Sequence, residues 1–212
     1  MTNTFNATTL TSQIKTMLEM QQAMNIKVHP QWHEQGFQWY RAIWVECAEM
    51  LDHYGWKWWK HQEIDIDQVQ LELVDIFHFG LSSKLTENSD FETLASEIAQ
   101  EMQSPYKEAD FTETLEILAA KALTTKNFDI ASFAGCLEQC NMSADSLFRS
   151  YVGKNSLNFF RQDHGYKDGT YLKIWNGRED NEYLVDIINS LDSSSVDFKE
   201  QVYSALEKAY PS

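Results

Sequence analysis

Apolar side chains recur every three or four residues along most of this 212-residue chain, which is the spacing of helices that bury one face. The pattern predicts helices over residues 10–25, 37–53 and 66–85. The last two are joined through residues 53–60, where Gly55 suits the C-terminus of a helix. Because this connection is short, we expect the second and third helices to pack antiparallel.

The second half of the chain continues the helical pattern. Residues 89–151 are acidic at first and then rich in Ala and Leu at helical spacing, which predicts two or more helices that cover the core. We expect a further helix over 145–162, a loop punctuated by glycines over 163–181, and a final amphipathic helix over 196–210. A strand-like alternation occurs only at 170–175.

The composition agrees with a helical protein. Hydrophobic residues make up 43% of the chain and aromatic residues 13%, with only 8 Gly and 3 Pro. We therefore expect an all-α fold with a helical bundle core. Residues 1–212 are expected to form one unit, in which residues 89–150 are an additional helical subdomain that caps the core.

The net charge of -15 argues against a nucleic-acid-binding protein, because an acidic surface repels the phosphate backbone. The charge is uneven, however. Residues 149–178 contain six basic and two acidic side chains, a local charge of +4. A cationic segment in so acidic a chain indicates a small anionic ligand.

The cysteines and the N-terminal residues indicate the cellular compartment of the protein. Cys47, Cys136 and Cys140 are odd in number and lack the flanking ligands of a zinc site, which is typical of reduced structural thiols in the cytosol. Residues 1–13 are polar, so we expect no signal peptide. No run approaches the ~18 apolar residues that a membrane span needs. A cytoplasmic protein without a membrane partner is expected.

The strongest chemical signal is a pair of acidic motifs. Glu46 and Glu49 stand at i and i+3, as do Glu72 and Asp75, so each pair lies on one helix face with Cβ atoms about 5–6 Å apart. Residues 39–51 and 69–81, which carry these acids, contain one other charged side chain, Arg41. Helices that are apolar all round are expected to be buried.

Buried carboxylates require a compensating partner. Two of them repel by about 4 kcal/mol at 4 Å for an effective dielectric constant near 20, and each also loses hydration. Protonation, salt bridges or metal ions can each supply the compensation, and basic residues in these helices are few. Oxygen-only ligands suit Mg²⁺, with Mn²⁺ as a substitute, and four acids can hold two or more ions that bridge substrate phosphates. Hydrolysis at phosphorus is the expected chemistry.

Other interpretations of these residues compete with a metal site. A single acidic pair is more often a solvated helix face, whereas two pairs in apolar helices reverse that preference. Asp75 and His78 imitate half of a di-iron carboxylate site, but a second acid-x-x-His pair is lacking, so we interpret His78 as a core histidine. Trp56, Trp58 and Trp59 suit base stacking and core or dimer packing equally.

A cationic helix face lies further along the chain. Lys154, Asn158 and Arg161 follow one another at three- and four-residue intervals and so share a face, with Lys167 and Lys173 in the next loop. Alone, such a face is usually solvated surface. Together with a carboxylate cluster it indicates a metal-bridged polyphosphate, which needs acids on one side and cations on the other.

Four stretches of the chain resemble the dimeric dUTPases, a branch of the all-α NTP pyrophosphatases that includes the MazG-like enzymes. They are MLEMQQAMN (17–25), WVECAEMLDHYGWKWWK (44–60), LELVDIFHF (71–79) and YVGKNSLNFFRQDHGYKDGTYLKIWNGREDN (151–181). These stretches cover about a third of the chain in the family's order. The paired acids are shared with the wider superfamily, whereas the stretch from 165 to 181 is more particular to dUTPases.

The resemblance implies a role for each matching residue. The metal ligands are Glu46, Glu49, Glu72 and Asp75, of which Glu46 and Glu49 are the catalytic pair and Glu46 orients the attacking water. The phosphate contacts are Lys154, Asn158, Arg161 and Lys173. The uracil and deoxyribose contacts are Gln21, Asn25, Trp56 and, with weaker support, Asn181.

The resemblance also implies the reaction and the assembly. The expected activity is Mg²⁺-dependent hydrolysis of dUTP to dUMP and pyrophosphate, with dUDP as a second substrate and attack at the β-phosphorus. The expected assembly is a homodimer that completes the active site, with residues 89–150 as a mobile cover. The alternatives are a related pyrophosphatase for another base and a non-catalytic protein that holds a nucleotide or a partner helix.

Overall fold

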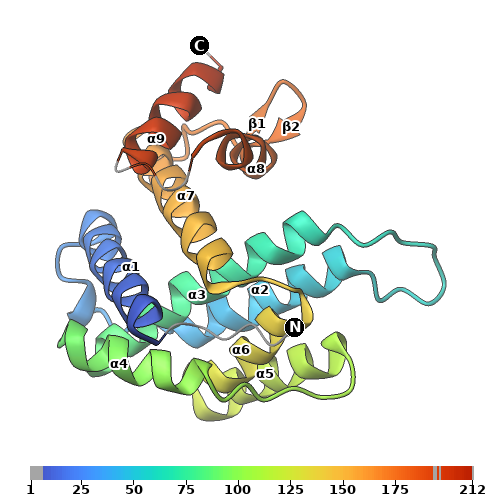
Figure 1. Cartoon of the computed structure of the whole chain (residues 1–212). Coiled ribbons are helices and arrows are strands. Elements are labelled where there is room, and N and C mark those ends of the chain that lie inside the picture. The colour runs from blue at the N-terminus through green and yellow to red at the C-terminus, as the bar shows by residue number, and fades with distance from the viewer. Residues whose placement is uncertain (1–6, 193–194, 196, 212) are drawn as a thin grey trace.

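The computed structural model describes residues 7–192, 195 and 197–211. Within these residues the chain forms nine α-helices and a two-stranded sheet, so the all-α expectation is confirmed (Figure 1). The elements are α1 Ala7–Val28, the 3₁₀ helix η1 Trp32–Glu34, α2 Trp39–Tyr54, α3 Ile66–Glu87, α4 Phe91–Met102, α5 Phe111–Thr125, α6 Ile130–Gln139, α7 Ala144–Asp163, β1 Ile174–Trp175, β2 Arg178–Glu179, α8 Asp180–Ser190 and α9 Phe198–Ala209.

The α2 and α3 helices form an antiparallel pair at the centre of the molecule, as predicted (Figure 1). The connection between them runs from Gly55, the C-cap of α2 with φ +88°, to Asp65, the N-cap of α3, and so extends beyond the expected residues 53–60. The backbone N–H of Asp65 donates to the carbonyl of His53 at 3.0 Å. This bond closes the base of a loop that projects from the bundle.

The two central helices differ in burial. The α3 helix is buried along most of its length, as its apolar sequence predicts. The expectation of burial all round is wrong for α2, where Trp44 and Val45 are each 39% exposed. Its Ile43, Cys47 and Met50 face the core, so α2 buries one side only.

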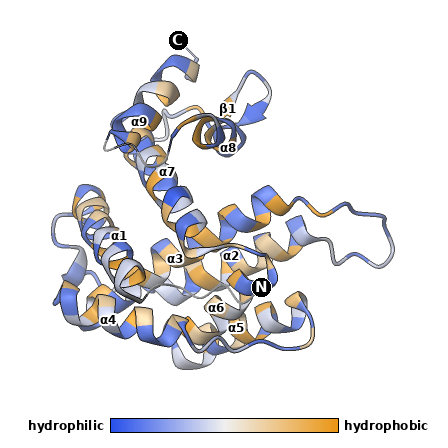
Figure 2. Ribbon diagram, in the orientation of Figure 1, coloured by the Kyte–Doolittle hydropathy of each residue, from blue (hydrophilic) through white to orange (hydrophobic). Residues whose placement is uncertain are grey.

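Residues 91–139 form three helices that pack beneath the central pair and α1, in agreement with the two or more predicted there (Figure 1). Each helix begins at an aspartate, Asp90, Asp110 or Asp129, whose side chain accepts a backbone N–H of the first turn. The three cysteines are buried free thiols. Figure 2 shows hydrophobic residues where α2, α3 and α6 meet and polar residues on the outer turns of α4.

The α7 helix links this body to a C-terminal group made of α8, α9 and the β1–β2 hairpin (Figure 1). Phe160 of α7 and Trp175 of β1 lie in a second hydrophobic cluster with residues of α8 and α9. The predicted loop over 163–181 ends in this hairpin, and α8, which follows it, was not expected. The final helix begins at Phe198; the first position predicted for it, Val196, lies outside the described residues, as do residues 1–6.

No helix within the described part of the chain has both the length and the apolar character to cross a bilayer.

Candidate active site

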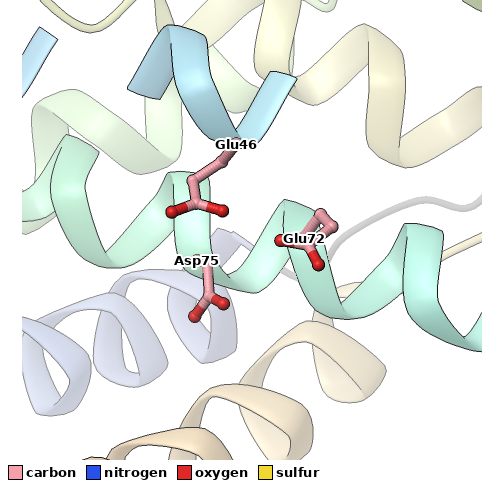
Figure 3. Close-up of side chains that lie close together, drawn as sticks. All are labelled: Glu46, Glu72 and Asp75. Atoms are coloured by element: carbon pink, nitrogen blue, oxygen red, sulfur yellow. The ribbon is translucent and has the colours of Figure 1, made fainter. Parts of the chain in front are cut away.

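Three carboxylates meet where α2 crosses α3. One oxygen from each of Glu46, Glu72 and Asp75 lies within 4.8 Å of the others (Figure 3). Glu72 is buried, and the other two are half-buried. The i, i+3 spacing on α3 places its two acids on one face, and the antiparallel packing of α2 brings Glu46 against that face.

The cluster binds protons tightly when no cation compensates it. Burial, followed by the charge of Asp75, raises the pKa of Glu46 to about 9. Burial and Asp75 also raise the pKa of Glu72, against the opposing effect of Lys154. At neutral pH the cluster therefore retains at least one proton, which a divalent cation would have to displace.

Glu49, the fourth predicted acid, lies on the exposed side of α2, outside the three-residue cluster. Its charge nevertheless contributes to raising the pKa of both Glu46 and Glu72. Its role as a metal ligand stays a prediction. The described cluster contains only carboxylate oxygens, which is the ligand set that Mg²⁺ and Mn²⁺ prefer.

Lys154 of α7 joins the acids to the cationic face. Its Nζ lies 2.7 Å from Oδ2 of Asp75 and donates to Oδ1 of Asn181 at 2.9 Å. The side chain is 2% exposed, so this is a buried ion pair. The structure thus brings together the carboxylates and the cationic helix face that the sequence predicts separately.

Arg161 lies two turns further along α7 and is held by a buried carboxylate. Its Nε and Nη2 donate to Oδ2 and Oδ1 of Asp180, both at 2.8 Å. Nη1 approaches Asn158 at 3.4 Å, and Nη2 also approaches Asn181 at 3.2 Å. Burial opposes the charge of Asp180, but the contact with Arg161 outweighs it and lowers the pKa of that carboxyl.

A cavity of about 340 Å³ opens beside these groups. Its charged and amide lining comes from α1, α2, α3 and α7, and includes Gln21, Asn25, Glu46, Asp75, Lys154, Asn158 and Arg161. Its apolar lining is Met24, Val28, Trp32, Phe37, Trp39 and Phe79. A cavity of this kind offers cations to an anion and flat apolar walls to a ring.

The predicted base contacts belong to a buried hydrogen-bond network. Nε2 of Gln21 donates to Oδ1 of Asn25 at 3.0 Å and to Oγ of Ser82 at 2.9 Å. The hydroxyl of Tyr151 donates to Oε1 of Gln21 at 2.6 Å. The ring of His78 stacks on Tyr151 with centroids 3.9 Å apart. These partners fix both amides at the cavity wall.

His78 is buried, as the core interpretation expects, and it also lines the cavity. Its Nδ1 lies 2.8 Å from the carbonyl of Val74, so the neutral ring donates there. Burial lowers the pKa of His78 to about 4, which keeps the imidazole uncharged.

Four of the predicted residues do not line the cavity, in addition to Glu49. Glu72 lies behind it in the carboxylate cluster, and Asn181 supports Lys154. Trp56 lies on the α2–α3 loop, where its Nε1 donates to Asp52 at 3.2 Å. Lys173 is exposed and pairs with Glu179 at 3.2 Å.

Sequence reasoning missed several residues that shape the site. Trp32 and Phe37 come from the segment between α1 and α2, which carries no periodic pattern. Tyr151 and Asp180 lie within the stretch that resembles dUTPases, but their roles depend on partners far away in sequence. The one signal in the sequence for Asp180 was its position as an acid next to the predicted Asn181.

A family model described as dUTPase matches residues 13–166, which include all of the elements from α2 to α7. No curated protein matches the chain.

Proposed function

Since the chain belongs to the all-α dimeric dUTPase family and is thereby a dUTP diphosphatase, we propose that it hydrolyses dUTP to dUMP and pyrophosphate with magnesium ions held at the α2–α3 crossing. The observation that supports this most directly is the contact between the acids and the cationic helix face. Asp75 and Lys154 touch at 2.7 Å, and both line one cavity.

The carboxylate cluster fits divalent ions by its donor chemistry. Glu46, Glu72 and Asp75 offer only oxygen ligands at short range, and Glu49 is the proposed fourth. Bound there, two or more Mg²⁺ ions neutralise phosphate charge and activate water, and Mn²⁺ is the proposed substitute. Glu46 is the proposed residue that orients the attacking water, because it faces both the cluster and the cavity.

The basic residues of α7 are suited to the phosphates. Lys154 provides a point charge and Arg161 a guanidinium edge, with the amide of Asn158 between them on the cavity wall. Lys173 and Asn181 are the proposed further contacts. Lys173 reaches the phosphates only if its exposed side chain leaves Glu179.

The amides of Gln21 and Asn25 are the proposed contacts to uracil, because amide groups match the donor and acceptor pattern of a base edge. The aromatic wall beside them, which includes Trp39 and Phe79, offers a surface for the ring. Trp56 is the further proposed contact. Since it does not line the cavity of its own chain, it reaches the base only by movement of its loop or across a dimer.

A homodimer is the proposed assembly. The exposed apolar side chains on and near the α2–α3 loop support it, because Trp58 and Trp59 are 90% and 57% exposed and Trp44 is exposed on α2. Sedimentation of the purified protein measures the mass directly. A cytoplasmic location is also proposed, on the ground that the three cysteines are buried free thiols.

One assay tests the reaction. Purified protein is incubated with dUTP, dUDP, dCTP, dTTP or UTP, in Mg²⁺ or in excess chelator, and the nucleotide and phosphate products are separated. The proposal expects dUMP and pyrophosphate from dUTP in Mg²⁺, dUMP and phosphate from dUDP, and no turnover with chelator. Preference for another base would make the enzyme a related pyrophosphatase, and binding of dUTP without product would indicate a non-catalytic protein.

A further inference from the structure

Asp180 is a fully buried acid in direct contact with Arg161. It is the first residue of α8 and is 0% exposed. Its two carboxylate oxygens each accept a hydrogen bond from Arg161 at 2.8 Å, which makes the ion pair bidentate. Asp180 does not line the cavity, whereas Arg161 does.

The carboxylate of Asp180 is itself held in place. The hydroxyl of Tyr171 donates to its Oδ2 at 2.8 Å, and its backbone N–H donates to the carbonyl of Lys173 at 3.0 Å. The Tyr171 ring stacks on Tyr210 with centroids 5.4 Å apart. The segment before β1, the start of α8 and the residue that follows α9 thus hold the two carboxylate oxygens of Asp180 against the guanidinium of Arg161.

This arrangement determines which edge of Arg161 is available. A guanidinium has five N–H donors, and Asp180 takes one from Nε and one from Nη2. The second Nη2 donor approaches Asn181. The Nη1 edge remains, with a contact of 3.4 Å to Asn158, which lines the cavity.

A contribution to the stability of the fold is a weak explanation for the buried ion pair between Arg161 and Asp180. Replacing a buried ion pair with apolar residues is often neutral or stabilising, because desolvation offsets the attraction. A bidentate contact, however, fixes the plane and direction of a guanidinium. Positioning a contact within about 1 Å can matter by about 100-fold in catalysis.

We propose that Asp180 is a positioning residue, which turns the Nη1 edge of Arg161 toward the phosphates of the bound nucleotide while Tyr171 fixes the carboxylate. This inference rests on the proposed function, in which Arg161 contacts phosphate. Asp180 and Tyr171 both lie beyond residue 166, where the family match ends. The hairpin and α8 therefore belong to the catalytic unit through this contact.

A double-mutant cycle tests the proposal. Arg161→Ala, Asp180→Asn and the double variant are compared with the unsubstituted protein for kcat and KM on dUTP in Mg²⁺. We expect kcat/KM to fall by about 100-fold for Arg161→Ala and by about 10-fold for Asp180→Asn, mainly in kcat. The double variant is expected to match Arg161→Ala, because Asp180 acts only through that side chain.

A matched control separates positioning from the general loss of an ion pair in α8. Asp186 lies in the same helix as Asp180 and pairs with Arg178 at 2.9 Å, and neither of these two residues lines the cavity. Asp186→Asn is expected to leave kcat unchanged. If Asp180→Asn does not fold, Tyr171→Phe takes its place in the cycle, with an expected fall of about 3-fold that disappears when Arg161 is alanine.

The outcomes distinguish the inference from the function. Unchanged kcat in Asp180→Asn, or a loss that adds fully to that of Arg161→Ala, overturns the positioning role. Where Tyr171→Phe stands in, an unchanged kcat or a fully additive loss in that variant overturns the role in the same way. Absence of dUTP hydrolysis in the unsubstituted protein, or full activity in Arg161→Ala, instead overturns the proposed function on which the inference rests.

Discussion

Lys154 and Asp75 form a buried ion pair, with Nζ of the lysine 2.7 Å from Oδ2 of the aspartate. The pair connects a residue proposed to bind phosphate with one proposed to bind metal. It also supplies a positive charge beside the three carboxylates, where burial and then the charge of Asp75 raise the pKa of Glu46 and Glu72. The stability of the metal-free site therefore depends on Lys154.

Lys154→Met is expected to destabilise the metal-free protein by about 3 kcal/mol, because the substitution leaves Asp75 without its partner in a largely buried setting. Mg²⁺ is expected to restore part of this loss. The measurement is urea unfolding with chelator and with Mg²⁺. Lys121→Met is the control, since its pair with Asp129 is more exposed and its loss is expected to cost no more than about 1 kcal/mol. Equal losses in the two variants would contradict the prediction.

Metal-free protein is expected to lose stability as the pH rises. The folded state raises the pKa of Glu46 from 4.5 to about 9, so it binds the proton more tightly than the unfolded chain. The contribution is complete below about pH 4.5 and is lost between there and about pH 9. Thermal unfolding in chelator should show Tm falling by about 5 °C or more over this window. Glu46→Gln should flatten the dependence of Tm on pH. If the variant keeps the same fall in Tm, the pH dependence arises from other groups.

Glu49→Gln is expected to keep the fold and to abolish turnover. The side chain is exposed, so its change is expected to alter the free energy of unfolding by no more than about 0.5 kcal/mol. Loss of a metal ligand is expected to lower kcat by at least about 100-fold. Glu200→Gln, at an exposed glutamate of α9 that does not line the cavity, is the matched control with unchanged kcat. Normal turnover in Glu49→Gln would remove this residue from the metal site.

Tyr151→Phe is expected to weaken base discrimination. The hydroxyl holds Oε1 of Gln21 at 2.6 Å, and its removal leaves a buried acceptor unpaired at a cost of about 1–2 kcal/mol. The ratio of kcat/KM for dUTP over dCTP should fall, because the Gln21 amide is no longer fixed. Tyr203→Phe, which removes a hydroxyl that contacts Asp163 at 2.9 Å, should leave the ratio unchanged. An unaltered ratio in Tyr151→Phe would place discrimination elsewhere.

Residues 89–150 are predicted to act as a mobile cover. Among the described residues, none that lines the cavity comes from this segment, so closure would require its movement. Hydrogen exchange in α4, α5 and α6 is expected to slow when a non-hydrolysable dUTP analogue binds in Mg²⁺. If exchange slows in α1 and α7 but stays unchanged in α4, α5 and α6, the prediction is wrong and these three helices do not move when the nucleotide binds.

The sequence predicts those parts of the site that depend on spacing within one helix. Glu72 and Asp75 share a face because they are about one turn apart, and Lys154 and Arg161 share one because they are about two turns apart. That α2 and α3 pack side by side was also predictable from the short connection between them. Contacts between distant helices were not, because the pairing of Lys154 with Asp75 depends on how α7 crosses α3.

The errors have local causes. The exposure of Trp44 and Val45 could not be read from an apolar helix, because periodicity does not tell a buried face from one that binds a partner. The α8 helix was missed because its first turn is acidic and polar. Its capping box, formed by Glu179 and Glu182, and the burial of Asp180 are visible only once the hairpin is folded.

One continuous helix, α7, carries Tyr151, Lys154, Asn158 and Arg161. The first and last of these are ten residues apart, a rise of about 15 Å, so in the proposed binding mode a single helix separates Tyr151, near the base, from Arg161 at the phosphates. Inserting a single residue between them would rotate Arg161 by about 100° relative to Tyr151 and turn it away from the cavity. In the proposed binding mode, the spacing of these two side chains along α7 matches the distance between the base and the phosphates of the nucleotide.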